Sequence, residues 1–242
     1  LKYDVFGQKQ KAEAEFMKWA NGKEDYAAVF PEWEKIYSAW RPYTQHRVYM
    51  AEGIYGSPLL AFASTLIQLE AALLKANATK QDVTNALNAA TEARKNFLAE
   101  HNAISDEKIV ATALMMYYAD VPKEQHPISF FEGVKGSFGD LKDEATWKKY
   151  AASVFANTMI LNDAKWNAFA ANPDGLKLQQ DPAFAIGSAF TKNWNVKFLP
   201  RFTEFTIKNN DLSRLYLKGI MEMNPAKAKK MYPDATFTMR VS

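Results

Sequence analysis

The chain has 242 residues, of which 48% are hydrophobic and 24% charged, with a formal net charge of +3 and no cysteine. This length buries roughly 70–75% of the unfolded surface without a disulfide or metal, and the composition excludes intrinsic disorder. The lack of cysteine excludes thiolate zinc sites, iron–sulfur clusters and cysteine nucleophiles. The small, evenly mixed charge gives no indication of nucleic acid as a partner.

No membrane span is predicted. The most apolar stretch, residues 59–69, is interrupted by Ser64, Thr65 and Gln68. It is also shorter than the roughly 18 residues that a spanning helix needs. The sequence opens at Leu1 inside a helical pattern, and not with methionine. We therefore expect an excerpt of a longer protein, with any targeting segment upstream.

The first third of the chain predicts three helical segments. Apolar residues at helical spacing predict helices over 1–20 and 24–40, the first of them ending at the stop pair Asn21-Gly22. A longer helical segment over 43–76 should be broken at 55–58, where a Tyr-Gly-Ser-Pro sequence brings in proline. Proline removes a backbone donor and so kinks or ends a helix.

Side chains that cap helices mark the following elements. Thr79 precedes Asp82 by three residues, a spacing close to a capping box, and predicts a helix that runs to about His101. Ser105 is expected to cap the next helix, which should stop before Pro122. Further helices are predicted after Pro127, at 143–156, at 162–171 up to a turn at 172–175, from Asp181 through Phe205 with a bend at Pro200, and at 212–223.

The last seven residues differ from everything before them. In 236–242, Phe237, Met239 and Val241 alternate with polar residues, which is typical of a β-strand. A single strand is not stable without a partner. We therefore expect an all-α domain over 1–235, with 236–242 as the start of a strand that belongs to a neighbouring β-rich domain.

The sequence selects no catalytic, cofactor-binding or metal-binding residue. The histidines His46, His101 and His126 are far apart and lack metal-ligand spacing, so each is interpreted as a surface or hydrogen-bonded helix residue. Ser57 is the one serine weighed as a nucleophile, but the following Pro58 at a helix break explains it without chemistry. Paired carboxylates fit helix first turns or solvated faces: Glu13 with Glu15, Asp106 with Glu107, and Asp143 with Glu144.

Two surface features admit more than one interpretation. Lys227, Lys229 and Lys230 form a small basic cluster that fits a helix C-terminus better than a nucleic-acid site. Aromatic residues are denser over 33–55 than one helix face can bury. Interhelical packing is the favoured explanation, and a surface that docks on a neighbouring domain or lines a groove is the alternative. The residues concerned are Trp33, Tyr37, Trp40, Tyr43, Tyr49 and Tyr55.

The C-terminal sequence carries a family resemblance. Residues 231–242 (Met-Tyr-Pro-Asp-Ala-Thr-Phe-Thr-Met-Arg-Val-Ser) resemble the junction at which bacterial serine dipeptidyl-peptidases of the dipeptidyl-peptidase 7 and dipeptidyl-peptidase 11 type return from a helical domain to a chymotrypsin-like barrel. That junction typically reads Tyr-Pro-Asp-Ala-Asn, and Thr236 takes the asparagine position here. Less specific stretches agree in order: 11–19, 40–49 and 181–185.

The resemblance implies a helical cap domain of an enzyme that releases dipeptides from the amino terminus of oligopeptides. In such enzymes a histidine, aspartate and serine triad lies in a double β-barrel, which would be this chain's main partner, and the enzymes are periplasmic or surface-exposed and tend to form homodimers. No site residue of the family carries over onto this chain. Asn193-Trp194-Asn195 lies too near the other end of the domain to match the family's Asn-Tyr-Trp-Lys stretch, which should precede Leu1.

Three hypotheses of different classes remain. The first is the excised cap domain, inactive alone and without cofactor, whose parent enzyme could prefer acidic or hydrophobic dipeptides. The second is a free-standing helical scaffold that binds a peptide or protein through its aromatic surface. The third is an all-α enzyme with an acid/base pair of carboxylates, for which the sequence selects no pair.

Overall fold

A computed structural model describes residues 4–229, and within this range every regular element is a helix and none is a strand. The all-α prediction is confirmed for this part of the chain. The predicted strand over 236–242, the junction motif that precedes it and the proposed domain end at residue 235 lie outside the described residues and stay predictions.

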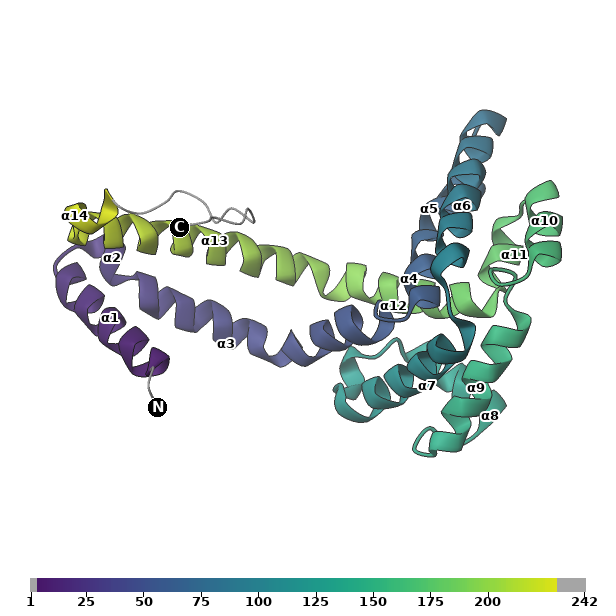
Figure 1. The fold of residues 1–242 in the computed structure, drawn as a ribbon, viewed down its shortest axis with the longest axis horizontal. Coiled ribbons are helices and arrows are strands. Elements are labelled where there is room, and N and C mark those ends of the chain that lie inside the picture. Colours follow the sequence, from purple (N-terminus) through teal and green to yellow (C-terminus); the bar gives the residue numbers. More distant parts are fainter. Residues whose placement is uncertain (1–3, 230–242) are drawn as a thin grey trace, which may run out of the picture. The chain divides into compact units, whose positions relative to one another are not determined.

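The described chain divides into two compact units. The smaller unit combines the residues up to Pro42 with those from Arg201 onward, and the larger unit is Tyr43–Pro200. Helices α3 and α13 contribute residues to both units (Figure 1). The smaller unit otherwise contains α1 (Val5–Ala20), α2 (Glu24–Ala27) and α14 (Pro225–Ala228), beside the first part of α3 (Val29–Val48) and most of α13 (Leu199–Met223).

Aromatic side chains hold the smaller unit together. The first part of α3 runs beside α13 (Figure 1), with ring centroids 5.4 Å apart for Trp33 and Tyr216 and 5.1 Å apart for Tyr37 and Phe205. Phe16 of α1 is fully buried, 4.7 Å from the Tyr216 ring. A Cβ atom at Gly219 would come within 2.6 Å of the Phe16 ring, so only glycine allows α13 to approach α1 this closely.

The larger unit is built from nine complete α-helices and two short helical segments around one apolar core. Its elements in chain order are η1 (Tyr49–Ile54), α4 (Pro58–Thr65), α5 (Ile67–Leu74), α6 (Lys80–Glu100), α7 (Ala103–Asp120), η2 (Lys123–Gln125), α8 (Ile128–Phe138), α9 (Glu144–Asn157), α10 (Asp163–Ala171), α11 (Gly175–Gln179) and α12 (Pro182–Lys197), beside the last part of α3.

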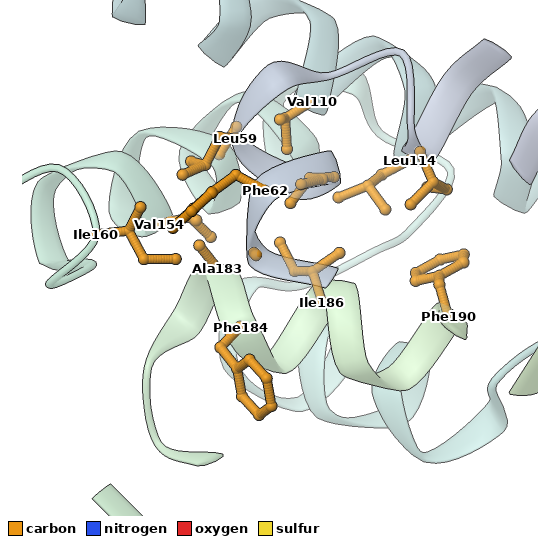
Figure 2. Close-up of a cluster of buried hydrophobic side chains, with 14 of the residues drawn as sticks. Leu59, Phe62, Val110, Leu114, Val154, Ile160, Ala183, Phe184, Ile186 and Phe190 are labelled. Carbon is orange, nitrogen blue, oxygen red and sulfur yellow. The ribbon is translucent and has the colours of Figure 1, made fainter. Parts of the chain in front are cut away.

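The core of the larger unit joins side chains from distant parts of the sequence. Figure 2 shows Leu59 and Phe62 of α4 facing Ile186 of α12, with Val110 of α7 and Val154 of α9 around them. Helices α4 and α12 approach closely at Gly187, which has no side chain. A Cβ atom there would lie 2.9 Å from the backbone nitrogen of Ser64.

Most helix boundaries follow the capping signals. Thr79 and Asp82 form the predicted capping box, with each side chain bonded to the other's backbone N–H. Helix α1 ends at Ala20 before Gly22, whose φ of 79° favours glycine. Helix α12 begins after Asp181 as expected.

Four predictions about helix boundaries are wrong. Asn102, and not Ser105, caps α7, because its Oδ1 accepts the Ser105 N–H at the third helical position. The helix predicted over 24–40 is two helices, the second of which passes through Pro42 to Val48. The helix predicted from Asp181 through Phe205 is divided at Phe198, between α12 and α13, and not bent at Pro200. The separate helix predicted at 212–223 is the end of α13. The turn predicted at 172–175 is confirmed at 172–174, and α11, which the sequence did not predict, begins at Gly175.

Candidate functional site

The candidate site is a groove in the larger unit, between η1 and α7, with a volume of about 530 Å³. This volume lies within the roughly 300–1,000 Å³ that is usual for small-molecule sites. Its apolar lining includes Val48, Ile109 and Met116, which are 47%, 40% and 42% exposed. Glu52 of η1 and Lys108 of α7 add one charge of each sign to the lining. The groove is thus mainly apolar with two opposite charges.

The direction of the two helices fixes where each side chain lies along the groove. The Tyr49 hydroxyl donates a hydrogen bond to Asp120, near the C-terminal end of α7. Four residues further along η1, Gly53 packs against Ala113, and a Cβ atom at Gly53 would lie 3.6 Å from the Ala113 Cβ. The two segments are therefore antiparallel.

At the Tyr49 end of the groove, the hydrogen bond between Tyr49 and Asp120 changes the pKa of the tyrosine. The hydrogen bond to the Asp120 carboxylate, followed by partial burial, raises the pKa of Tyr49 to about 12. The phenol therefore stays protonated at physiological pH and continues to donate to Asp120. This hydrogen bond connects the start of η1 to the end of α7 and thereby positions one wall of the groove.

The η1 wall is a π-helical segment, in which the N–H of Tyr55 donates to the carbonyl of Met50 at 2.9 Å. Such segments are rare and often lie at functional sites. The sequence predicted a break of the helical segment at 55–58 but did not predict the π-helix before it. The sequence signal for this unusual backbone is the glycine at position 56, just after η1. A Cβ atom there would lie 2.0 Å from the Glu52 carbonyl oxygen.

Two of the three histidines lie at a buried tyrosine, outside the groove lining. His46 and His126 are 0% and 3% exposed, and their rings lie 5.5 and 5.2 Å from the Tyr117 ring. The Nδ1 atom of His46 is 3.0 Å from the Tyr117 hydroxyl, and Nε2 of His126 is 2.9 Å from the Val121 carbonyl. Burial lowers the pKa of His46 to about 4 and also lowers the pKa of His126. Both are neutral, hydrogen-bonded core residues, and the surface alternative is wrong for them.

The third histidine forms a buried pair with a carboxylate. Nε2 of His101 lies 2.9 Å from Oδ2 of Asp106, which also accepts the backbone N–H of Leu59 at 2.8 Å. Asp106 lies in the first turn of α7, as predicted, but it is 2% exposed and lies on no solvated face. The pair lies where the end of α6, the first turn of α7 and the start of α4 meet, and both side chains are buried between these helices.

Ser57 acts as a helix cap. Its Oγ accepts the backbone N–H of Leu60 at 3.2 Å at the start of α4, as the helix-break interpretation predicts. Asp143 caps α9 in the same way, and Glu144 follows in its first turn. Glu13 and Glu15 are both exposed on α1. Among residues 4–229, no group of three or more histidine, aspartate and glutamate side chains could hold a metal ion.

The dense aromatic residues pack between helices. Besides the contacts of Trp33 and Tyr37 with α13, the Trp40 ring stacks on Phe205 at 5.6 Å. In the larger unit Tyr43 lies 5.8 Å from Phe198, and the Tyr55 hydroxyl is 2.8 Å from Thr191 Oγ1. The favoured explanation is confirmed for these five residues. Tyr49 differs, because it also lines the groove.

The lysine cluster lies at the end of the described chain. Helix α14 ends at Ala228, so Lys229 follows a helix C-terminus as interpreted, while Lys230 lies outside the described residues.

No single helix in the part of the chain that the structure describes is long and apolar enough to cross a membrane. Residues 24–54 and 58–74 pass that test only as a pair bent by 101°.

Comparison with solved structures identifies the class of domain. The chain matches the crystal structure of Porphyromonas endodontalis DPP11 in complex with the dipeptide Arg-Glu, with a TM-score of 0.68 and 16% sequence identity. The match covers 90% of this chain and 30% of that one. A domain with the fold of this chain is therefore present within the longer chain of that protein.

Sequence comparison gives the family. The family model of peptidase S46 matches residues 1–242, and the chain belongs to this family. An Asp/Glu-specific dipeptidyl-peptidase of Flavobacterium psychrophilum is 26% identical over 248 residues, which cover 100% of this chain and 32% of that protein. An Asp/Glu-specific dipeptidyl-peptidase of Porphyromonas gingivalis is 27% identical over 142 residues, 58% of this chain and 18% of that protein.

The resemblance seen in the sequence is thus confirmed at the level of the family. The chain spans about a third of the length of the first relative, and less of the second. No residue of this chain is assigned a catalytic role by these comparisons.

Proposed function

We propose that this chain is the helical cap domain of a serine-type dipeptidyl-peptidase. The observation that carries the proposal is the match of the S46 family model to all 242 residues, although they correspond to only 32% of a relative's length. The helical structure, without a strand in residues 4–229, agrees with a role outside a β-barrel catalytic domain.

The cap would act by shape and electrostatics. It would cover the cleft of a double β-barrel that supplies the serine nucleophile and histidine base, exclude water and limit access to the free end of an oligopeptide. A charged amino terminus costs much free energy to desolvate unless polar groups meet it, so a cap with polar lining would favour that end. The parent protein would be periplasmic or exposed at the cell surface, and would form a homodimer.

The first test measures cleavage of dipeptidyl chromogenic substrates by the 242-residue chain and by the longer protein from the same gene. We expect turnover, blocked by a serine-directed inhibitor, only in the longer protein. Turnover by the 242-residue chain itself would contradict the proposal.

The second test deletes residues 1–235 from the longer protein and joins the flanking segments by a flexible linker. Loss of the restriction to peptide ends is expected, so that acetylated peptides are cleaved at internal bonds. If the coding sequence stops close to residue 242, so that no longer protein exists, the free-standing binding module is correct instead. The preference for acidic or hydrophobic dipeptides would be read from a substrate panel.

A further inference from the structure

The turn between α1 and α2 consists of Asn21 and Gly22, and both residues are exposed. A hydrogen bond from the Lys23 N–H to the Ala20 carbonyl, at 2.9 Å, closes the turn. Gly22 has a φ of 79°, and apart from its chain neighbours nothing lies within 4 Å of the position that a Cβ atom would take. The backbone nitrogen of Gly22 is therefore uncrowded and lies outside the helices.

The side chain of Asn21 is not held by the fold. It has no hydrogen-bond partner among residues 4–229, whereas Asn102 and Asn162 each cap a helix through Oδ1. Asn21 also borders an open hollow of about 450 Å³, beside Lys18 and Tyr26. The amide group can therefore turn toward the nitrogen of the next residue, and water reaches it.

The sequence contains one other place where an asparagine or aspartate precedes glycine, at Asp174-Gly175. There the structure holds both residues. Oδ1 of Asp174 accepts the Leu176 N–H at 2.7 Å as the cap of α11. Gly175 is buried, and a Cβ atom on it would lie 2.5 Å from the Leu74 side chain. A reaction between the two residues would first have to break the cap and separate packed atoms.

We infer that Asn21-Gly22 is a site of spontaneous modification, at which the asparagine converts to isoaspartate or aspartate. The Gly22 nitrogen bonds to Cγ of Asn21 and gives up its proton, while the side-chain amide nitrogen leaves as ammonia. Water then opens the cyclic imide at either carbonyl. Opening at the main-chain carbonyl gives isoaspartate, and opening at Cγ gives aspartate. Each conversion takes up one water, releases one ammonia and leaves one new carboxylate.

The reaction is favoured here because glycine has no side chain to obstruct its own nitrogen. It also alters the packing of α1. Isoaspartate lengthens the main chain by one carbon atom within a short turn. That turn holds Tyr26 of α2 against α1, with ring centroids 5.0 Å from Trp19 and 6.4 Å from Phe16. Conversion should therefore loosen the contact between the two helices.

The test incubates the 242-residue chain at pH 8 and follows residues 19–23, which trypsin releases by cutting after Lys18 and Lys23. Compared with a sample digested at the start, we expect the mass gain of an amide-to-acid change and methylation by an isoaspartyl methyltransferase. Asn21→Gln should abolish both signals, because glutamine would have to close a larger ring. The converted chain should also show faster amide hydrogen exchange at Tyr26 than the Asn21→Gln chain.

The matched control is Asp174→Asn, which places the same two residue types at the capped position. In the folded chain, conversion there should be at least about fivefold slower than at Asn21, because the helix cap must first break. In urea, which removes the cap, the two positions should convert at similar rates.

Two results would overturn the inferred site. One is an Asn21 that stays unchanged in the folded chain but converts in urea. The other is equal conversion of positions 21 and 174 in the folded Asp174→Asn chain. Unchanged hydrogen exchange after conversion would overturn the effect on α1. None of these readouts involves peptide cleavage, so they stand apart from the tests of the cap function.

Discussion

The hydroxyl of Tyr117 lies 3.0 Å from Nδ1 of His46, and both side chains are excluded from solvent. The His46 ring also lies 4.0 Å from the tilted ring of Phe198 and stacks on Trp194 at 5.7 Å, so the imidazole is enclosed by aromatic surface. Its Nε2 atom has no hydrogen-bond partner among residues 4–229. Such surroundings accommodate a neutral imidazole and disfavour a charged one.

This enclosure predicts that acid destabilises the fold. Burial, with smaller electrostatic contributions from His126 and Lys197, lowers the pKa of His46 from 6.5 to about 4. Above pH 6.5 neither state binds the proton, and the residue has no effect on the free energy of unfolding. Between pH 6.5 and 4 the unfolded chain binds a proton that the folded chain does not. Stability therefore falls as the pH falls, by about 3 kcal/mol in total from this residue.

Urea unfolding at pH 7.5 and 5.5 measures this effect. We expect the His46→Phe variant to lose less stability between the two values than the unaltered chain, because phenylalanine cannot bind a proton. His126, whose lowered pKa acts in the same direction, should keep part of the dependence in both proteins. Equal pH dependence of the two proteins would show that His46 does not carry it.

Asp181 is predicted to be a major determinant of stability. Its buried carboxylate accepts the backbone N–H groups of Ala183 and Phe184 at the start of α12. It also accepts the Met159 N–H at 2.7 Å and the Thr158 hydroxyl at 2.9 Å. Asp181→Ala should cost about 2–4 kcal/mol of unfolding free energy, because it removes the helix cap and leaves buried donors without an acceptor.

The comparison with Asp181→Asn makes that test specific. Asparagine keeps one side-chain oxygen that can accept the two N–H groups of the α12 cap, so its cost should be smaller than that of alanine. Chemical denaturation of both variants gives the two values. An alanine variant as stable as the asparagine variant would contradict the capping role.

Gly187 is predicted to tolerate no side chain. A Cβ atom there would lie 2.9 Å from the Ser64 nitrogen and 3.2 Å from the Ala63 carbonyl carbon, both backbone atoms of α4. Gly187→Ala should therefore push α12 and α4 apart and cost about 1–3 kcal/mol. Gly136→Ala in α8 is the control, because nothing lies within 4 Å of its Cβ position. It should stabilise the protein by up to about 1 kcal/mol through helix propensity. Thermal unfolding that gives both substitutions the same sign would refute the proposed packing.

The ion pair between Glu70 and Lys192 is predicted to matter more than an exposed pair. The Glu70 carboxylate is 5% exposed and lies 2.8 Å from Lys192 Nζ, with Gln179 Nε2 at 2.7 Å. Lys192→Met leaves a buried charge with a single neutral partner and should cost about 1–3 kcal/mol. Lys208→Met, which breaks the exposed pair with Glu204, should give no measurable change. Similar unfolding midpoints for the two variants would show that burial does not strengthen the first pair.

Local signals in the sequence predicted most of the secondary structure. The capping box at Thr79, the Asp181-Pro182 helix start and the stop at Gly22 act within a few residues of the chain. Such signals depend on backbone hydrogen bonds and φ preferences that neighbours alone determine. They fail where two candidates compete, as with Asn102 and Ser105, or where packing overrides a proline, as at Pro42.

Family membership and the absence of a selected reaction centre also came from the sequence, through the junction motif and the scattered histidines. Only the tertiary structure decided that His46 and His126 meet at Tyr117, that Asp106 is buried beside His101, and that η1 and α7 enclose a groove. Apart from the contact of His101 with Asp106, which are five positions apart, these contacts join residues far apart in the sequence, such as His46 and Tyr117 at 71 positions, and no local pattern encodes them. They arise because burying apolar helix faces brings distant polar groups together, which must then find partners inside the protein.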